Sequence, residues 1–141
     1  MSKYGAKKVI IDGITFDSKA EGEFYLLLKK MRENEEIKEF EMQPTFELQP
    51  KYKSPDGSGK TIRSIKYIAD FRITYPDDRI EVVDIKGFPT TDFKLKKKMF
   101  EYKFGVPLTV LKYTKKNGFV DWDEYEKQKR LRKKLSKNIE I

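Results

Sequence analysis

The sequence contains no cysteine and no histidine among its 141 residues. Disulfide bonds, thiolate zinc sites and nucleophile systems that use cysteine or a serine–histidine pair are therefore excluded. Any catalysis has to use Asp, Glu, Lys or Tyr side chains, or a metal ion held by oxygen atoms. Oxygen ligands favour Mg²⁺ or Mn²⁺ over zinc.

Long apolar runs are also missing from the chain. No stretch approaches the roughly 20 apolar residues that a membrane-spanning helix needs. Residues 1–5 lack the apolar segment of a secretory signal. We therefore expect a cytoplasmic protein without a membrane partner.

What the sequence has in excess is positive charge. Its 31 Lys and Arg residues exceed its 23 Asp and Glu residues, which gives a formal net charge of +8. An excess of this size favours binding to a polyanion such as DNA, RNA or an anionic membrane surface, without choosing between them. With 10 Phe and 8 Tyr, the chain has enough apolar mass for a single folded core.

The pattern of apolar residues predicts an α/β (α+β) fold, in which a central sheet is flanked by helices. We expect one domain over residues 1–120, followed by a basic helix or tail over 121–141. Asp12-Gly13 predicts a hairpin turn, and Ser18 with Glu21 matches a helix capping box. In chain order, we expect a hairpin over 7–16, a helix over 18–34, strand segments over 37–49 broken at Pro44, an exposed loop over 50–60, strands over 62–75 and 80–86, a helix over 93–104, a strand over 108–113 and a final helix over 121–137.

Two neighbouring strands carry charged residues where the pattern is otherwise apolar. Asp70 lies in one strand, and Asp84 and Lys86 project from the same face of the other because they are two residues apart. If that face is partly buried, these charges need partners, which a metal ion and its bound water would supply. We interpret Asp70 and Asp84 as metal ligands, together with the backbone carbonyl of Ile85. Lys86 would position the attacking hydroxide or stabilise the phosphate in the transition state.

Each of these residues also has a purely structural interpretation. Glu21 can complete the metal shell or orient a ligand water, but helix capping alone also explains it. Asp84 and Lys86 can form a surface ion pair of little energetic value. Asp70 can be a strand-edge acid that is paired with a nearby basic residue, Arg63, Lys66 or Arg72.

The pairing of the two strands decides whether the two aspartates can share a metal ion. A symmetric turn centred on Asp77-Asp78 places Asp70 opposite Ile85 and not opposite Asp84. A shared metal site therefore requires a bulge or a loop of odd length, which moves the pairing by one residue.

In their order along the chain, these motifs resemble the signature of the PD-(D/E)XK nuclease superfamily. The resemblance rests on four short segments: Ser18-Lys19-Ala20-Glu21, Gln43-Pro44-Thr45-Phe46, Ile68-Ala69-Asp70-Phe71 and Val83-Asp84-Ile85-Lys86-Gly87. Ala69 stands where the signature has proline. More narrowly, residues 4–112 are similar to small phage and prophage endonucleases related to archaeal Holliday-junction resolvases.

The resemblance implies a restriction-endonuclease-like fold, with a mixed central β-sheet flanked by helices, and cleavage of DNA that depends on Mg²⁺ or Mn²⁺. A phage-encoded enzyme would act in the host-cell cytoplasm, and the likeness to resolvases suggests branched DNA and a role in recombination. Symmetric cutting of a four-way junction would require a homodimer. By position, the resemblance makes Glu21 the helix acid, Asp70 and Asp84 the metal ligands, Lys86 the catalytic lysine and Gln43 a polar residue near the scissile phosphate.

Two basic segments are the candidate DNA-binding surfaces. Lys94, Lys97 and Lys98 share one face of the second predicted helix by their spacing. In the tail we select Lys129, Arg130 and Lys133 as contacts to the DNA backbone. The alternatives are a solvated helix face for the first group and a frayed end for the second.

Two further functions compete with a nuclease. One is a non-catalytic nucleic-acid-binding module that keeps the nuclease fold. It would use the basic segments but would not need Asp70, Asp84 and Lys86 together. The other is a phage structural or interaction protein that binds an acidic partner and has no metal affinity.

Overall fold

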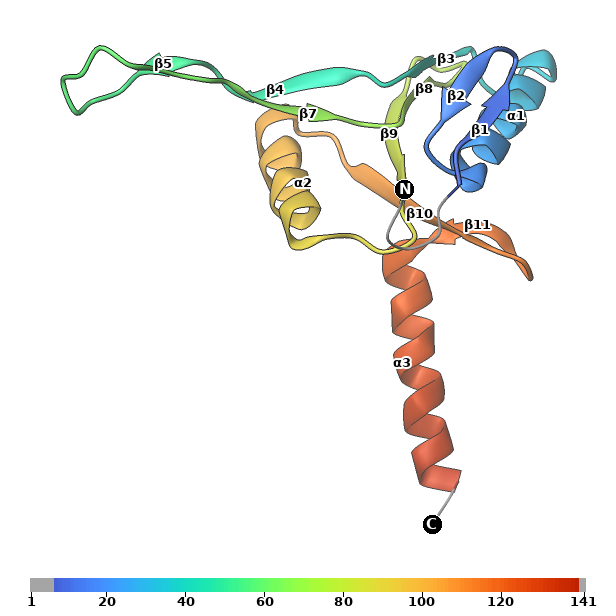
Figure 1. The fold of residues 1–141 in the computed structure, drawn as a ribbon. Coiled ribbons are helices and arrows are strands. Elements are labelled where there is room, and N and C mark those ends of the chain that lie inside the picture. Colours follow the sequence, from blue (N-terminus) through green and yellow to red (C-terminus); the bar gives the residue numbers. More distant parts are fainter. Residues whose placement is uncertain (1–6, 140–141) are drawn as a thin grey trace.

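The computed structural model describes residues 7–139 and shows a mixed α+β fold (Figure 1). A five-stranded mixed sheet is flanked by helices, with a hairpin before it and a helix after it. The fold class expected from the sequence is therefore confirmed. Residues 4–6, where the family resemblance begins, and residues 140–141 of the predicted tail lie outside the described residues.

The helices are α1 (Lys19–Glu33), α2 (Thr91–Phe104) and α3 (Trp122–Ile139). The strands are β1 (Val9–Ile11), β2 (Ile14–Phe16), β3 (Glu39–Met42), β4 (Thr45–Gln49), β5 (Tyr52–Lys53), β6 (Thr61–Ile62), β7 (Ile65–Ile68), β8 (Phe71–Thr74), β9 (Ile80–Ile85), β10 (Leu108–Thr114) and β11 (Gly118–Asp121). Strand β11 was not expected from the sequence, which indicated only a turn at Asn117-Gly118.

The central sheet has the strand order β11-β10-β9-β8-β3. Strands β9 and β10 are parallel, and the other neighbouring pairs are antiparallel. Strand β9 is the middle strand, and its residues alternate between two cores. Val83 and Ile85 face the core that contains α1, whereas Val82 faces the core that contains α2. Asp84, which is two residues after Val82, therefore projects from the α2 face of the sheet.

Side-chain caps fix where the first two helices begin. The Ser18 hydroxyl accepts a hydrogen bond of 3.1 Å from the backbone N–H of Glu21, which confirms that half of the capping box. The second helix begins at Thr91 and not at the predicted Phe93, because Thr90 is its N-cap and accepts from the N–H of Phe93. Gly105, at φ 64°, ends this helix.

The hairpin β1–β2 lies against the first helix. Asp12 and Gly13 both have positive φ, at 53° and 76°, as a two-residue hairpin turn requires. The Asp12 carboxylate accepts hydrogen bonds from the Tyr25 hydroxyl at 2.8 Å and from Lys29 Nζ at 2.7 Å. These contacts hold the hairpin turn beside the middle and second half of α1.

The strand predicted over residues 62–75 is not continuous. It is broken at Arg63-Ser64 and again at Ala69-Asp70, and its neighbour is broken opposite the second gap, at Gln43-Pro44. The N–H of Gln43 donates to the carbonyl of Asp70 at 2.9 Å, and the N–H of Ala69 donates to the carbonyl of Pro44 at 3.1 Å. Pro44 has no N–H, so it cannot continue the regular ladder. The two strands keep one register through the break but leave the central sheet.

Beyond the break, strands β4–β7 and then β5–β6 form a two-stranded ribbon over residues 45–68, which we call the arm (Figure 1). The expected exposed loop over residues 50–60 was therefore wrong in part, because Tyr52–Lys53 pairs with Thr61–Ile62. The base of the arm packs on α2. The Phe46 ring lies 4.8 Å from the Phe100 ring, and Lys103 Nζ donates to the carbonyl of Glu47 at 2.6 Å.

At the other end of the chain, α3 projects from the sheet as a long helix (Figure 1). Its exposed apolar side chains include Leu131 and Leu135. None of the helices in the described part of the chain is both long and apolar enough to cross a lipid bilayer.

We expect Phe100→Ala to destabilise the protein by about 3–5 kcal/mol, because Phe100 is 1% exposed and joins the arm to α2. Tyr102→Ala on the same helix is the matched control. Its side chain is 94% exposed, so a change within about 0.5 kcal/mol is expected. Urea unfolding of both variants measures the difference, and equal losses would show that the arm is not anchored through Phe100.

Candidate functional site

The turn between β8 and β9 determines which residues of the two strands face each other. Thr74 pairs with Ile80 and Phe71 pairs with Val83, so residues 75–79 form a connection of odd length. Asp78 adopts a positive φ of 68° within it, and its N–H donates to the carbonyl of Tyr75. Continuing the same register places Asp70 opposite Asp84. The odd-length loop that a shared site requires is thus confirmed.

Asp70 and Asp84 are held together by two reciprocal hydrogen bonds. The N–H of Asp70 donates to Asp84 Oδ1 at 2.9 Å, and the N–H of Ile85 donates to Asp70 Oδ2 at 2.8 Å. Each carboxylate therefore accepts from the backbone of the other strand, at the point where β7 leaves the sheet. Both side chains are fixed in position by main-chain atoms.

Asp84 is 1% exposed and is the only fully buried charged residue within residues 7–139. Its Oδ2 atom is buried and accepts no hydrogen bond from the residues that the structure describes. Burial raises the pKa of the Asp84 carboxyl to about 6, against the opposing effects of Lys86 and the Asp70 N–H. An unpaired carboxylate oxygen in the interior is costly, so this atom needs a partner.

Glu21 comes from the first turn of α1 and lies beside the aspartate pair. Burial, followed by the negative charges of Asp70 and Asp17, raises its pKa to about 7. Burial also raises the pKa of Asp70, although the Ile85 N–H and Lys86 act in the opposite direction. The capping and functional interpretations of Glu21 are compatible, because they use different groups. The backbone N–H of Glu21 donates to the Ser18 hydroxyl, while its carboxyl group is close enough to Asp70 for that charge to raise its pKa.

Gln43 joins the same group of residues. Together with Glu21 and Asp70 it lines a cavity of about 260 Å³, whose other walls come from β2, Met42 and Phe71. Gln43 has a positive φ of 52°, which is uncommon for a residue other than glycine. The structure therefore brings together Glu21, Gln43 and Asp70, as the sequence motifs suggested.

Lys86 follows the end of β9 on the same face as Asp84. Its Nζ lies over the ring of Phe93, 4.7 Å from the centroid. Its charge lowers the pKa values of Glu21, Asp70 and Asp84. Among the described residues it forms no salt bridge, and Asp84 is buried, so the surface ion pair considered for Asp84 and Lys86 is wrong.

The strand-edge alternative for Asp70 is also not found. Of the basic residues considered as its partners, Arg72 pairs with Glu41 instead. Within the part of the chain that the structure covers, neither Arg63 nor Lys66 forms a salt bridge with Asp70.

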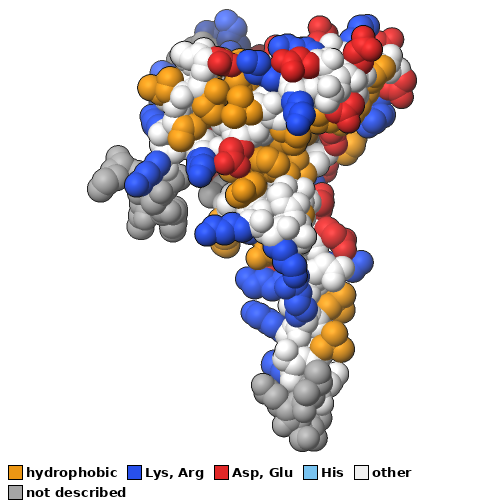
Figure 2. Space-filling model, turned by 90° about the vertical axis from the view of Figure 1, so that its right-hand side faces the viewer, with side chains coloured by type: hydrophobic (Ala, Val, Ile, Leu, Met, Phe, Trp, Pro, Cys, Tyr) orange, Lys and Arg blue, Asp and Glu red, His pale blue; other side chains and the backbone are white. Residues whose placement is uncertain are grey.

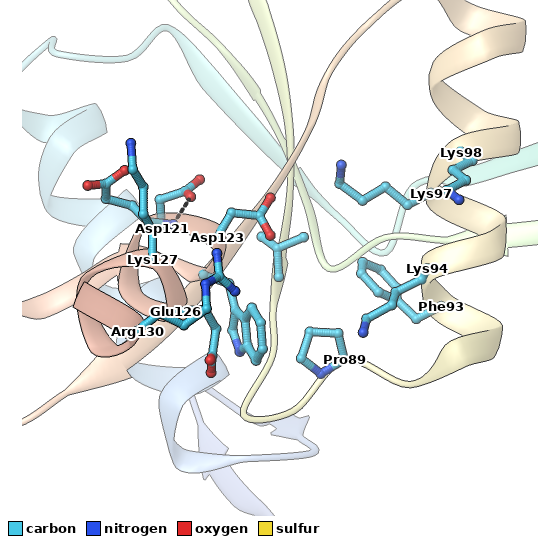
Figure 3. Close-up of a pocket in the computed structure, with 13 residues that line it drawn as sticks. Pro89, Phe93, Lys94, Lys97, Lys98, Asp121, Asp123, Glu126, Lys127 and Arg130 are labelled. Atoms are coloured by element: carbon cyan, nitrogen blue, oxygen red, sulfur yellow. Dashed lines mark hydrogen bonds between the residues drawn. The ribbon is translucent and has the colours of Figure 1, made fainter. Parts of the chain in front are cut away.

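The three lysines predicted on one face of the second helix do lie together. Lys94, Lys97 and Lys98 line one wall of a cleft of about 630 Å³ between α2 and α3, and Arg130 lies on the facing wall (Figure 3). Lys127, which was not selected from the sequence, lies on that wall one helical turn before Arg130. The same wall carries acidic residues, Asp121, Asp123, Glu124 and Glu126, so the cleft has mixed charge.

Lys129 and Lys133 face away from this cleft. With Arg132, Ser136 and Lys137 they line a separate hollow along α3. Figure 2 shows Lys and Arg side chains gathered along one edge of this helix, with hydrophobic side chains on the opposite edge. The three tail residues predicted to bind DNA are therefore divided between two faces of α3.

The contacts of the carboxylates limit which of them could bind a metal ion. Within residues 7–139, no group of three or more Asp and Glu residues is arranged so that it could hold a metal ion. Glu21, Asp70 and Asp84 therefore do not form such a group in the described residues, and their joint ligation of a metal ion stays a prediction. The oxygen atoms that fit a hard cation are those of Asp70 and Asp84, since the Oδ2 atom of Asp84 has no other partner.

A family model described as "Protein of unknown function (DUF1064)" matches residues 1–118, and the chain belongs to this family. The matched segment ends at the start of β11 and does not include α3. No curated protein and no solved structure matched the chain.

Without a bound metal, we expect Asp84→Asn to make the protein more stable than wild type at pH 8. The folded-state pKa of Asp84, about 6, lies above the ordinary value of 3.8, so the folded protein binds more protons between these values. The free energy of unfolding therefore falls as the pH rises through this window, by on the order of 3 kcal/mol from Asp84 alone. Asparagine stays neutral and avoids this loss.

Thermal unfolding at pH 5 and pH 8 in the presence of EDTA measures this effect. The wild type should lose more stability between the two pH values than Asp84→Asn does. Asp123→Asn is the matched control, since Asp123 is exposed. If the wild type and Asp84→Asn lost the same stability between the two pH values, ionisation of Asp84 would not destabilise the folded protein.

Proposed function

We propose that this member of the DUF1064 family is a metal-dependent DNA endonuclease that hydrolyses phosphodiester bonds. The observation that carries the proposal is the buried Oδ2 atom of Asp84, which has no hydrogen-bond partner among the described residues. It lies in a carboxylate pair that the backbone holds rigidly, with an unpaired ammonium group nearby. A structural ion pair would not leave this atom without a partner.

Asp70 and Asp84 would hold the ion, joined by the carbonyl of Ile85. When bound, Mg²⁺ or Mn²⁺ would acidify a water molecule and offset the negative charge on the phosphate. Burial favours this assignment, because a cation would stabilise the ionised forms of two carboxyl groups whose pKa values are otherwise raised.

Lys86 and Glu21 are assigned different roles in the reaction. The Lys86 ammonium, held against the Phe93 ring, stabilises the negative charge that develops on the phosphate oxygens. The pKa of Glu21, about 7, suits a carboxyl group that takes up a proton from the attacking water at neutral pH. The Gln43 amide is assigned to hold a phosphate oxygen in the cavity that it shares with Glu21.

The basic residues of α2 and α3 would hold the DNA backbone beside this site. Val110 and Phe93 line the cleft between the two helices. Val110 is the register partner of Asp84, and the Phe93 ring contacts Lys86. The cleft therefore begins on the same face of the sheet as Asp84 and Lys86.

A second candidate function is a nucleic-acid-binding module without chemistry. It is favoured by the absence of a three-residue carboxylate group in the described part of the chain. This candidate predicts DNA binding that does not change when metal is added, and no cleavage of any substrate.

Cleavage assays with a lysine variant test the endonuclease directly. We expect Mg²⁺ or Mn²⁺ to support cutting of labelled linear, flapped or four-way-junction DNA, and EDTA to abolish it. Lys86→Ala should lower the rate by about 10²-fold or more, since it removes charge stabilisation from the transition state. Lys116→Ala, at an exposed lysine in the β10–β11 turn, is the control.

The outcome for Lys86→Ala decides between the two functions. Loss of cutting with DNA binding retained establishes the nuclease and identifies its preferred substrate structure. Wild-type protein that binds all three DNA structures but cuts none of them would instead favour the binding module. Equal rates for Lys86→Ala and wild type would remove Lys86 from the mechanism.

Neutralising the α3 contacts should weaken DNA binding in a salt-dependent manner. Each phosphate contact adds about 0.9 to the slope of log affinity against log salt, so the triple variant of Lys129, Arg130 and Lys133 to Gln should reduce this slope by about 2 to 3. Because Arg130 faces the cleft and the other two do not, Arg130→Gln alone shows which face contributes. An unchanged slope would mean that α3 does not contact DNA.

A further inference from the structure

The arm is a two-stranded ribbon that projects from the molecule and is covered by other elements only at its base (Figure 1). Its strands are paired from Thr45↔Ile68 to Gln49↔Ile65 and again at Tyr52↔Ile62 and Lys53↔Thr61. An irregularity lies between Glu47 and Gln49, and residues 50–51 and 63–64 separate the two paired sections. An isolated pair of strands is only marginally stable in water, so a ribbon of this kind is expected to gain a partner. Tyr52, Ile65 and Ile68 are exposed along it.

The tip of the arm has a definite structure. The N–H of Ser54 donates to the carbonyl of Lys60 at 2.8 Å, and the N–H of Ser58 donates to Asp56 Oδ1 at 2.9 Å. Lys53 Nζ donates across the ribbon to Thr61 Oγ1 at 2.8 Å. The ribbon is therefore paired up to its tip. From Thr45 to Lys53 the ribbon spans about 26 Å at the usual rise of a strand.

The arm carries positive charge that the protein does not neutralise. Its basic residues are Lys51, Lys53, Lys60, Arg63 and Lys66, and its acidic residues are Glu47 and Asp56. Across residues 7–139, no salt bridge involves any of these basic side chains. One of the two acidic groups, Asp56, is used in the turn at the tip.

The base of the arm is part of the candidate active site. Strand β7 ends next to Ala69 and Asp70, and strand β4 begins after Gln43 and Pro44. The hydrogen bonds between these two segments fix the arm relative to the carboxylate pair. A polymer bound at Asp70 that continues past α2 would therefore run along the arm.

We propose that the arm enters the major groove of double-stranded DNA next to the cleavage point. This inference rests on the proposed function, because it takes DNA as the substrate of the Asp70–Asp84 site. The major groove of B-form DNA is about 12 Å wide and admits a two-stranded ribbon, whose basic side chains then reach the phosphates on both sides. The span of the arm corresponds to about seven to eight base pairs.

Charge and shape separate this partner from the other candidates. A second copy of the arm would carry the same excess of positive charge and would be repelled. A single strand needs a groove with several aromatic side chains for stacking, whereas the arm beyond its base, over residues 50–63, carries one aromatic side chain, Tyr52. Double-stranded RNA has a deep and narrow major groove that side chains cannot enter. The arm should therefore distinguish duplex DNA from duplex RNA.

Binding without cleavage tests the proposal. Affinity is measured by fluorescence anisotropy with a labelled duplex of about 20 base pairs, in EDTA, at salt concentrations between about 50 and 200 mM. The test variant carries Lys51→Gln, Arg63→Gln and Lys66→Gln, at exposed positions that make no side-chain hydrogen bond within the described residues. The control variant carries Lys30→Gln, Lys115→Gln and Lys116→Gln, which removes the same charge from α1 and the β10–β11 turn, away from the arm (Figure 1).

We expect the test variant to bind duplex DNA about tenfold or more weakly, with a salt slope lower by about 2 to 3. The control variant should keep most of the wild-type affinity, and duplex RNA should show little difference between the wild type and the test variant. A second variant replaces residues 53–61 with Asn-Gly, so that Tyr52 and Ile62 become the last pair of a shorter hairpin. It should show the same loss while retaining the wild-type melting temperature.

Equal losses in the test and control variants would overturn the proposal, because general charge would then explain binding. Equal losses on duplex DNA and duplex RNA would overturn the role of the major groove. A dimer in the wild type that dissociates in the arm variants would assign the arm to a second copy of the chain. The EDTA measurement does not depend on catalysis, so absence of cleavage with Mg²⁺ would contradict only the proposed function.

Discussion

Two hydrogen bonds between Asp70 and the Asp84 strand determine the arrangement of the site. They form because β8 and β9 continue to face each other after their regular pairing ends at Phe71 and Val83. At that point the backbone of Asp70 is hydrogen-bonded to a neighbouring segment on each side. Its N–H donates to the carboxylate of Asp84, and its carbonyl accepts from the N–H of Gln43. The same residue thus ends the central sheet, fixes the carboxylate pair and sets the base of the arm.

Much of the fold could be predicted from local chemistry. The Asp12-Gly13 turn, the Ser18 cap and the grouping of Lys94, Lys97 and Lys98 follow from residues that are close in sequence. The break at Ala69-Asp70 could not be predicted, because residues 62–75 are continuously strand-like and the break depends on Pro44 and on a carboxylate from β9. The division of the α3 residues between two faces was also missed, since it depends on where Trp122 and the sheet place the helix.

The candidate site shows how burial and function oppose each other. Asp84 would be a poor choice for stability alone, since a neutral side chain of the same size could accept the Asp70 N–H without the cost of burying a charge. The protein keeps a carboxylate near the end of the middle strand of the sheet, between a valine and an isoleucine. Residues that lower local stability in this way are commonly found where a protein binds or reacts. The positive charge of Lys86 partly offsets the cost of burying the Asp84 carboxylate. In the described part of the chain, Lys86 forms no salt bridge.

The odd length of the β8–β9 connection has an evolutionary consequence. Side chains along a strand alternate with a period of two, so a one-residue slip of β9 against β8 would turn Asp84 towards the opposite core and separate it from Asp70. The buried valine and isoleucine residues of β9 resist such a slip, so a change of length in residues 75–79 has to be absorbed within the turn. Homologues that keep the aspartate pair should therefore keep the pairing of β8 with β9 whatever the length of this turn, while the tip of the arm, which holds neither Asp70 nor Asp84, is free to vary.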